Sequence, residues 1–166
     1  LALGSVATSQ VGPVVPPSGV NSGTIGIYGG LYTTGGATAI TITTAGTYYQ
    51  WASTTVGSSS NMTVSAATDD ITANIAGTYH LAVACSFTAT ANATVTMRAF
   101  KEGVGMTNCD ATRKISSGGD VGAFGITCLV PSVAVNDSFT LHFTSTSNAD
   151  TVTPTECNMN TIYVGS

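Results

Sequence analysis

Few residues in this chain carry groups that could take part in catalysis. A nucleophilic Ser or Cys requires an adjacent base and a group that orients it, and the only histidines are His80 and His142. Each histidine alternates with apolar neighbours, which predicts a position on the more polar face of a strand, at the surface or between subunits. Asp69 and Asp70 are typical of a turn, and no known metal, phosphate or nucleophile motif is present. The sequence therefore indicates a protein that is not an enzyme and has no cofactor.

The four cysteines leave several states open. Cys85 and Cys128 are predicted on the apolar sides of strands, where a free thiol behaves as a small hydrophobe. Cys109 and Cys157 stand in polar contexts, TNCDAT and TECNMN, which resemble loops, and these two could pair. Zinc would require a CxxC or a Cys/His cluster, which the spacings of 24, 19 and 29 do not supply. We favour free thiols, keep one or two disulfides as the alternative, and expect no metal.

An aromatic group early in the chain is the one candidate ligand platform. Tyr48, Tyr49 and Trp51 could together present ring faces to a sugar. Packing in the core or at a subunit interface is favoured over this, because Trp51 alternates with Gln50 on a predicted strand.

Charge is scarce and confined to part of the chain. The 166 residues contain 4 Lys and Arg against 8 Asp and Glu, for a net charge of -4. This balance argues against nucleic acid, whose binding needs a dense basic surface. The four cations are interleaved with Glu102 and Asp110, so a balanced, solvated face is expected from Arg98, Lys101, Arg113 and Lys114. No apolar run approaches the ~18 residues that would span a bilayer, and we expect no membrane partner.

The N-terminal part is uncharged and rich in Pro and Gly. Residues 1–68 contain no Asp, Glu, Lys or Arg, and the segment VGPVVPPSGVNSG (11–23) favours extended conformations with no core of its own. Residues 1–44 are therefore predicted to be an arm, and residues 45–166 the folded domain. An apolar arm is better explained if it lies on another protein, although a disordered tail is the alternative. The predicted anchoring residues are Val11, Val14, Val15, Pro16 and Pro17.

The rest of the chain reads as short strands. Thr, Ser, Ala and Gly dominate, and residues that build long helices are scarce. Period-two alternation is clearest at 79–89, and further strands are predicted at 62–64, 71–75, 94–101, 124–130, 139–144 and 159–164. GVGMTN (103–108) is predicted to be a loop, and Asn136 with Asp137 a hairpin-like turn. This spacing indicates an all-β sandwich. The predicted core is Leu81, Val83, Phe87, Ile126, Phe139, Leu141 and Phe143.

The order of these strands resembles a known family over about residues 70–166. AGTYHLAVACSF (76–87), TVTMRAFKEGV (94–104), the stretch 115–143 and NTIYVGS (160–166) are similar to the tumour-necrosis-factor and complement-globular-head jelly rolls. The sequence departs from that family at Asn136, where the family has Gly before Asp. Gly-, Thr- and Ala-rich forms of this pattern are similar to phage capsid decoration proteins and fibre heads. The resemblance implies an antiparallel jelly roll of ten strands and a homotrimer packed edge to face.

These observations favour a structural role. We expect a trimeric decoration or cement protein of a phage virion, which binds the major capsid protein or another virion protein through its arm. The alternative is a receptor- or carbohydrate-binding head of a fibre or adhesin.

Overall fold

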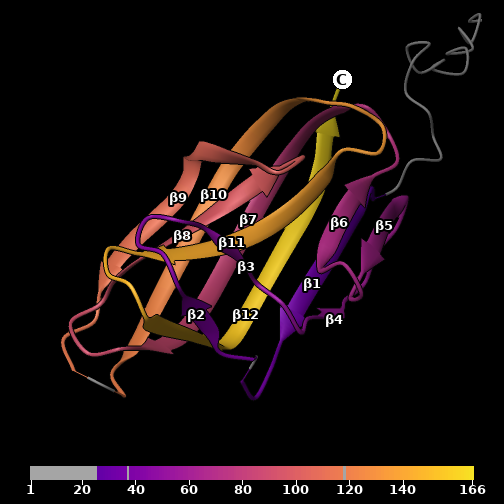
Figure 1. Cartoon of the computed structure of the whole chain (residues 1–166). Helices are drawn as coiled ribbons and strands as arrows, with labels where there is room; N and C mark the ends of the chain where they lie inside the picture. The colour runs from indigo at the N-terminus through magenta and orange to yellow at the C-terminus, as the bar shows by residue number, and fades with distance from the viewer. Residues whose placement is uncertain (1–25, 37, 118) are drawn as a thin grey trace, which may run out of the picture.

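The chain folds into two antiparallel β-sheets packed face to face (Figure 1). The computed structural model describes residues 26–36, 38–117 and 119–166, and these contain no helix and twelve strands rather than the ten that the family resemblance implies. Sheet I has the order β10-β7-β12-β1-β4, with β2 paired to β12, and sheet II has the order β5-β6-β11-β8-β9, with β3 paired to β11. The all-β jelly-roll sandwich predicted from the sequence is confirmed.

The strand bounds follow the alternation of the sequence. Sheet I contains β1 (Tyr28–Thr33), β2 (Ile40–Ile42), β4 (Thr55–Val56), β7 (Gly77–Ala89), β10 (Val121–Val133) and β12 (Asp150–Gly165). Sheet II contains β3 (Tyr49–Gln50), β5 (Met62–Ser65), β6 (Asp70–Ala73), β8 (Thr94–Lys101), β9 (Val104–Lys114) and β11 (Ser138–Ser145).

The core lies between the two sheets. Because side chains alternate along a strand, every second residue of β7, β10 and β11 faces the opposite sheet. The seven core residues predicted from the sequence are all buried, none more than 4% exposed. Trp51 joins them at 1% exposed and is thus a core residue, as the favoured interpretation predicts.

The predicted boundary between arm and domain is wrong. Residues 28–33 form β1, which pairs with β12 from Tyr28 opposite Ile162 to Thr33 opposite Cys157, and residues 40–42 form β2 on the same partner. Leu31 and Ile42 are buried in the core. The folded domain therefore includes residues that the sequence analysis assigned to the arm. The prediction missed them because their burial depends on a partner strand more than a hundred residues away. The predicted anchoring residues 11–17 lie outside the described residues.

Two segments predicted as loops are strands. GVGMTN runs into β9, and the polar stretch around Cys157 is the middle of β12. Both carry many polar residues because one side of each strand faces solvent. The turn at Asn136 and Asp137 exists, but it is not a hairpin: β10 belongs to sheet I and β11 to sheet II, so the turn crosses between the sheets.

All four cysteines form disulfides, which corrects both the free-thiol expectation and the proposed pairing of Cys109 with Cys157. Cys85 bonds to Cys157, its direct neighbour across β7 and β12. Cys109 of β9 bonds to Cys128 of β10 and so ties the edge of sheet II to the edge of sheet I. Figure 1 shows β9 and β10 side by side at that edge of the sandwich.

Candidate functional surfaces

The outward side of sheet I is a broad surface almost free of charge. It is formed by the outward side chains of β10, β7, β12 and β1, and we call it the uncharged face. Most of these side chains are small, such as Ala82, Ala84 and Ala123. Its larger exposed apolar residues are Val121, Leu129, Ile162 and Val164 with Tyr28 and Tyr32. Asp150 of β12 is buried and accepts a hydrogen bond from Ser145, so Glu156 is the one exposed charged side chain in the strands of sheet I.

Strand register places four of the larger side chains of this face in one line. Leu129 lies opposite His80, His80 opposite Ile162, and Ile162 opposite Tyr28. Leu129 is 54% exposed and Ile162 is 50% exposed. The line therefore forms an apolar ridge that crosses four strands with its side chains directed at solvent.

A shallow hollow lies on the same face, toward the other end of the strands. Its volume is about 360 Å³, and its lining includes Tyr32, Ala84, Ser86, Ala123, Asn158 and Glu156. Small side chains on β7 and β10 leave this space, and Glu156 stands at its rim where β12 has a bulge. The Glu156 carboxylate accepts a hydrogen bond from the Gly35 amide at 3.2 Å.

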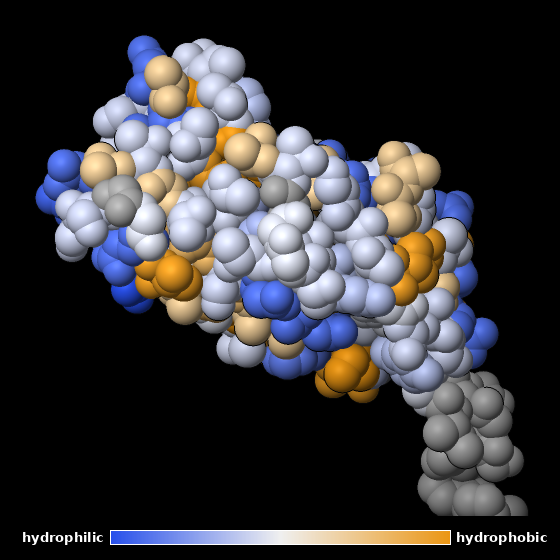
Figure 2. Space-filling view, turned by 90° about the horizontal axis from the view of Figure 1, so that it is seen from below, coloured by the Kyte–Doolittle hydropathy of each residue, from blue (hydrophilic) through white to orange (hydrophobic). Residues whose placement is uncertain are grey.

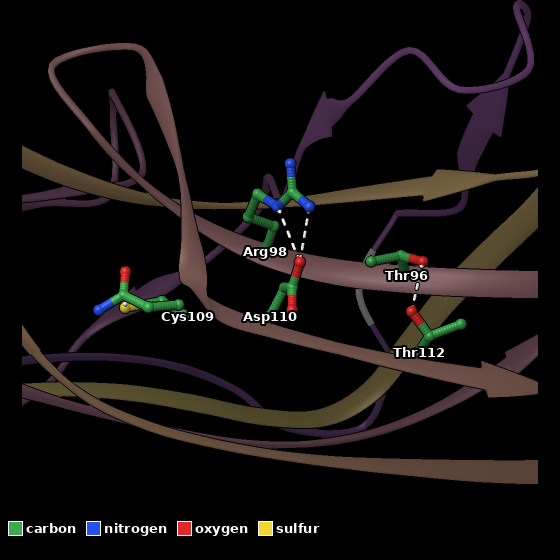
Figure 3. Close-up of polar contacts among 6 residues, drawn as sticks. Thr96, Arg98, Cys109, Asp110 and Thr112 are labelled. Atoms are coloured by element: carbon green, nitrogen blue, oxygen red, sulfur yellow. Dashed lines mark hydrogen bonds and ion pairs between the residues drawn. The ribbon is translucent and has the colours of Figure 1, made fainter.

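The outward side of sheet II has a different chemistry. Here Arg98 of β8 donates two hydrogen bonds to one carboxylate oxygen of Asp110 on β9, at 3.1 and 2.6 Å (Figure 3). The guanidinium also lies 4.8 Å from the centre of the Tyr48 ring. Burial raises the pKa of Tyr48, while the positive charge of Arg98 opposes this rise. We call this side of sheet II the ionic face.

The ionic face continues as an aromatic stack on β8 and β11. Phe100 stacks on His142 with 4.0 Å between ring centres, and the edge of the Tyr48 ring meets Phe100 at 5.4 Å. His142 Nε2 lies 2.9 Å from the Thr140 hydroxyl, and its Nδ1 is buried without a partner among the described residues. This desolvation lowers the pKa of His142 to about 4, so the imidazole is neutral at physiological pH.

The predicted ligand platform is not formed. Trp51 is in the core, and Tyr49 packs against the core with its hydroxyl bonded to Thr43. Tyr48 alone of the three lies on the ionic face, beside Arg98. The cations behave largely as expected of a balanced surface: Arg98 pairs with Asp110, and Lys101 lies 3.3 Å from Asp137.

The chemistry-bearing residues are spread over the molecule. His80 lies on the uncharged face and His142 on the ionic face, so the sandwich separates the two histidines. Among the described residues, no three His, Cys, Asp or Glu side chains gather closely enough to hold a metal ion. No helix in the described part of the chain is long and apolar enough to cross a membrane.

The sequence did not reveal the apolar ridge or the position of Glu156. Both depend on the pairing of β12 with β1 and β7. The first half of β12 has no clear alternation of apolar and polar residues, so it was not predicted as a strand. The exposed aromatic Tyr28 beside two glycines was the one available signal.

Figure 2 shows one side of the molecule, seen from below relative to Figure 1. Most of the surface in this view is pale, the colour of residues of intermediate hydropathy such as Thr, Ser and Gly, and apolar residues form separate orange patches.

Comparison with known proteins identifies the fold. No protein-family model matches the chain, and no curated protein matches it. Among solved structures, the chain is similar to the Eiger tumour necrosis factor of S. frugiperda, with a TM-score of 0.65 over 85% of this chain and 94% of that one. The identity is 9%, so the similarity shows a TNF-like jelly roll and nothing about activity.

Proposed function

We propose that this protein is a non-enzymatic structural protein of a virion surface, a homotrimeric capsid decoration protein held on the capsid by its N-terminal segment. The observation that carries the proposal is the uncharged face. A solvent-exposed sheet that presents Leu129, Ile162 and Tyr28 in one line, with a single carboxylate nearby, is suited to burial against protein.

The low charge of this face favours self-association. Burying an ion without a partner costs several kcal/mol, whereas small uncharged side chains lose little on leaving water. The core of a protein interface is likewise depleted in charge. The ionic face is different, because it carries the charged pair of Arg98 with Asp110, and His142 there stacks on Phe100 of the same chain.

The oligomeric state tests this part of the proposal. Light scattering of the full chain should give three times the 16.6 kDa mass. Ile162→Asp, which places a charge in the apolar ridge, should abolish the trimer. Val104→Asp on β9 of sheet II, at an apolar side chain that is 69% exposed, is the matched control and should leave it intact. A folded wild-type monomer at micromolar concentration would exclude this assembly.

The anchoring role belongs to the segment before the sheet. Residues 11–17 combine Val and Pro without charge, which allows burial on a partner at little desolvation cost, and proline limits the entropy lost on ordering. Since β1 and β2 are part of the sandwich, the informative truncation removes residues 1–25 and not 1–44.

The truncated chain should form a cooperative trimer that no longer sediments with capsids of its virus. Substituting Val14 and Val15 by Asp in the full chain should weaken sedimentation without changing the melting temperature. Capsid occupancy equal to wild type in both variants would place the anchor in the jelly roll.

A carbohydrate-binding head is the second candidate, and one observation favours it. Tyr48 with the Arg98–Asp110 pair combines an aromatic ring with planar hydrogen-bonding groups on the ionic face. This arrangement replaces the predicted platform, because Trp51 is buried. A glycan array that detects binding by wild type but not by Tyr48→Ala would favour this function over a purely structural one.

A further inference from the structure

Three asparagines of the chain stand in the pattern Asn-x-Ser/Thr, which is the acceptor pattern for N-linked glycans. They are Asn61 in NMT, Asn92 in NAT and Asn136 in NDS. The chain is rich in Asn, Thr and Ser, so the pattern alone carries little weight. The fold adds a second criterion. A glycan is bulky and lies at the surface, so a folded chain can carry one only on an exposed asparagine that has no other contacts to keep.

These three asparagines share a backbone conformation that sets them apart. Their φ angles are 52°, 64° and 73°, in the left-handed region that Asn tolerates better than most residues. All three are exposed. None of the other asparagines that the structure describes lies in this region, and these are residues 74, 108, 148, 158 and 160.

The side chains of the three asparagines are also not used by the fold. Within the described residues none of them forms a hydrogen bond, whereas Asn74 and Asn148 each accept one and Asn160 donates one to Asn158. None of these four hydrogen-bonded asparagines is followed by Ser or Thr two positions later. The asparagines whose side chains the fold uses therefore lie outside the acceptor pattern, and those inside it are free to be modified.

The three positions leave the outward side of sheet I open. Asn92 lies in the turn that joins β7 to β8, and Asn136 in the turn that joins β10 to β11. These turns are at opposite ends of the sandwich, because Val133 of β10 lies opposite Gly77 at the start of β7, whereas Asn92 follows the end of β7. Asn61 directly precedes β5, the outermost strand of sheet II (Figure 1).

The disulfides indicate the compartment in which the chain folds. All four cysteines are paired, and disulfides persist in oxidising compartments such as the lumen of the endoplasmic reticulum. N-linked glycans are added in that same lumen. The surface is also poor in charge, since charged residues make up 7% of the chain, and Val135 beside Asn136 is 52% exposed. Glycans at the turns would supply the solubility that charge does not.

We propose that Asn61, Asn92 and Asn136 are acceptors of N-linked glycans. In each transfer the Asn Nδ2 attacks the first sugar carbon of a lipid-linked oligosaccharide. A C–N bond forms, and the C–O bond to the lipid pyrophosphate breaks. Nδ2 loses one proton and the lipid pyrophosphate leaves, so nothing is oxidised or reduced.

This inference goes beyond the proposed function and bears on its setting. The bacterial cytoplasm does not contain the transferase that adds these glycans. Glycans at the three turns therefore belong to a virion made in a eukaryotic cell and not to the phage expected from the sequence.

Translation of the full chain behind a cleavable signal sequence, in the presence of endoplasmic-reticulum microsomes, tests the three sites. Wild type should gain three glycans, seen as steps on a gel and removed by peptide N-glycosidase F. Each of the variants Asn61→Gln, Asn92→Gln and Asn136→Gln should lose one step, and the triple variant should lose all three. Thr94→Ala should abolish the glycan on Asn92, whereas Thr94→Ser keeps the pattern and should retain it.

A second measurement establishes that the folded protein carries the glycans. The chain secreted from insect cells should contain them with both disulfides formed, by intact mass under non-reducing conditions. A chain left unmodified by microsomes, or glycans absent from the secreted protein, would overturn this inference and leave the proposed trimer and capsid role standing. A glycosylated monomer would overturn the trimer and leave the acceptor sites standing.

Discussion

The two outer faces of this sandwich share one core but use their side chains in opposite ways. On the ionic face Arg98 pairs with Asp110 and lies over the Tyr48 ring, and Tyr48 in turn contacts the stack of Phe100 on His142. The uncharged face leaves Leu129, Ile162 and Tyr28 exposed, and Glu156 forms no salt bridge within the part of the chain that the structure describes. A charged pair formed within one chain needs no partner, whereas a row of exposed apolar side chains favours burial against another protein.

The largest effect on stability is expected from a substitution in the core between the two sheets. Leu81 is fully buried on the inner side of β7, and Leu81→Ala should reduce the free energy of unfolding by about 2–5 kcal/mol, through lost burial and the cavity left behind. Denaturant unfolding followed by fluorescence measures this change. A cost below about 1 kcal/mol would mean that the two faces do not rest on one cooperative core.

The disulfide at the edge should come next. The double variant Cys109→Ala with Cys128→Ala removes the disulfide that joins sheet II to sheet I across a sequence separation of 19 residues. Its loss should reduce the free energy of unfolding by about 3 kcal/mol. Thermal unfolding with and without reductant measures this, because reductant should destabilise wild type more than the double variant. If the double variant melts as wild type does, the two edges are held together by packing alone.

The ionic face should respond to acid through His142. Its pKa in the folded chain is about 4, below the ordinary value of 6.5, so between these values the unfolded chain binds a proton that the folded chain does not. Stability should therefore be lost as the pH falls from about 6.5 toward 4, with no further loss from this group below that range. His142→Gln should flatten this part of the profile of melting temperature against pH. An unchanged profile would contradict the burial of the imidazole.

The smallest effect is expected from the ion pair. The side chains of Arg98 and Asp110 are 23% and 32% exposed, and pairs of this kind contribute less than about 1 kcal/mol. A double-mutant cycle with Arg98→Met and Asp110→Asn measures the coupling. A coupling of several kcal/mol would show that the ionic face contributes to stability far more than its exposure indicates.

The sequence predicted what depends on local alternation. The burial of one side of β7, and of Phe139, Leu141 and Phe143 on β11, follows from period two and was confirmed. The extent of β9 and β12 was not predicted, because their polar residues face solvent on one side and no local pattern separates such a strand from a loop.

The errors about the candidate sites have the same physical origin. Pairing of Cys85 with Cys157 requires β7 and β12 to be neighbours. The assignment of β1 to the arm was wrong because the sequence does not show that β1 pairs with β12. Trp51 was correctly favoured as a core residue from its position on a predicted strand, but the sequence did not show that Tyr48 lies on the opposite side of the chain, beside Arg98. Long-range pairing, which a single sequence does not display, decided all of these points.

The pairing of β1 with the end of β12 has a practical consequence. The Tyr163 amide donates to the Ile27 carbonyl, so the chain enters the sandwich beside the point where it leaves. A peptide fused after Ser166 would emerge beside Ile27, at the start of the sandwich. The turn at 90–93 follows the far end of β7, the length of that strand away from this point. Insertions for display of foreign epitopes therefore belong in that turn.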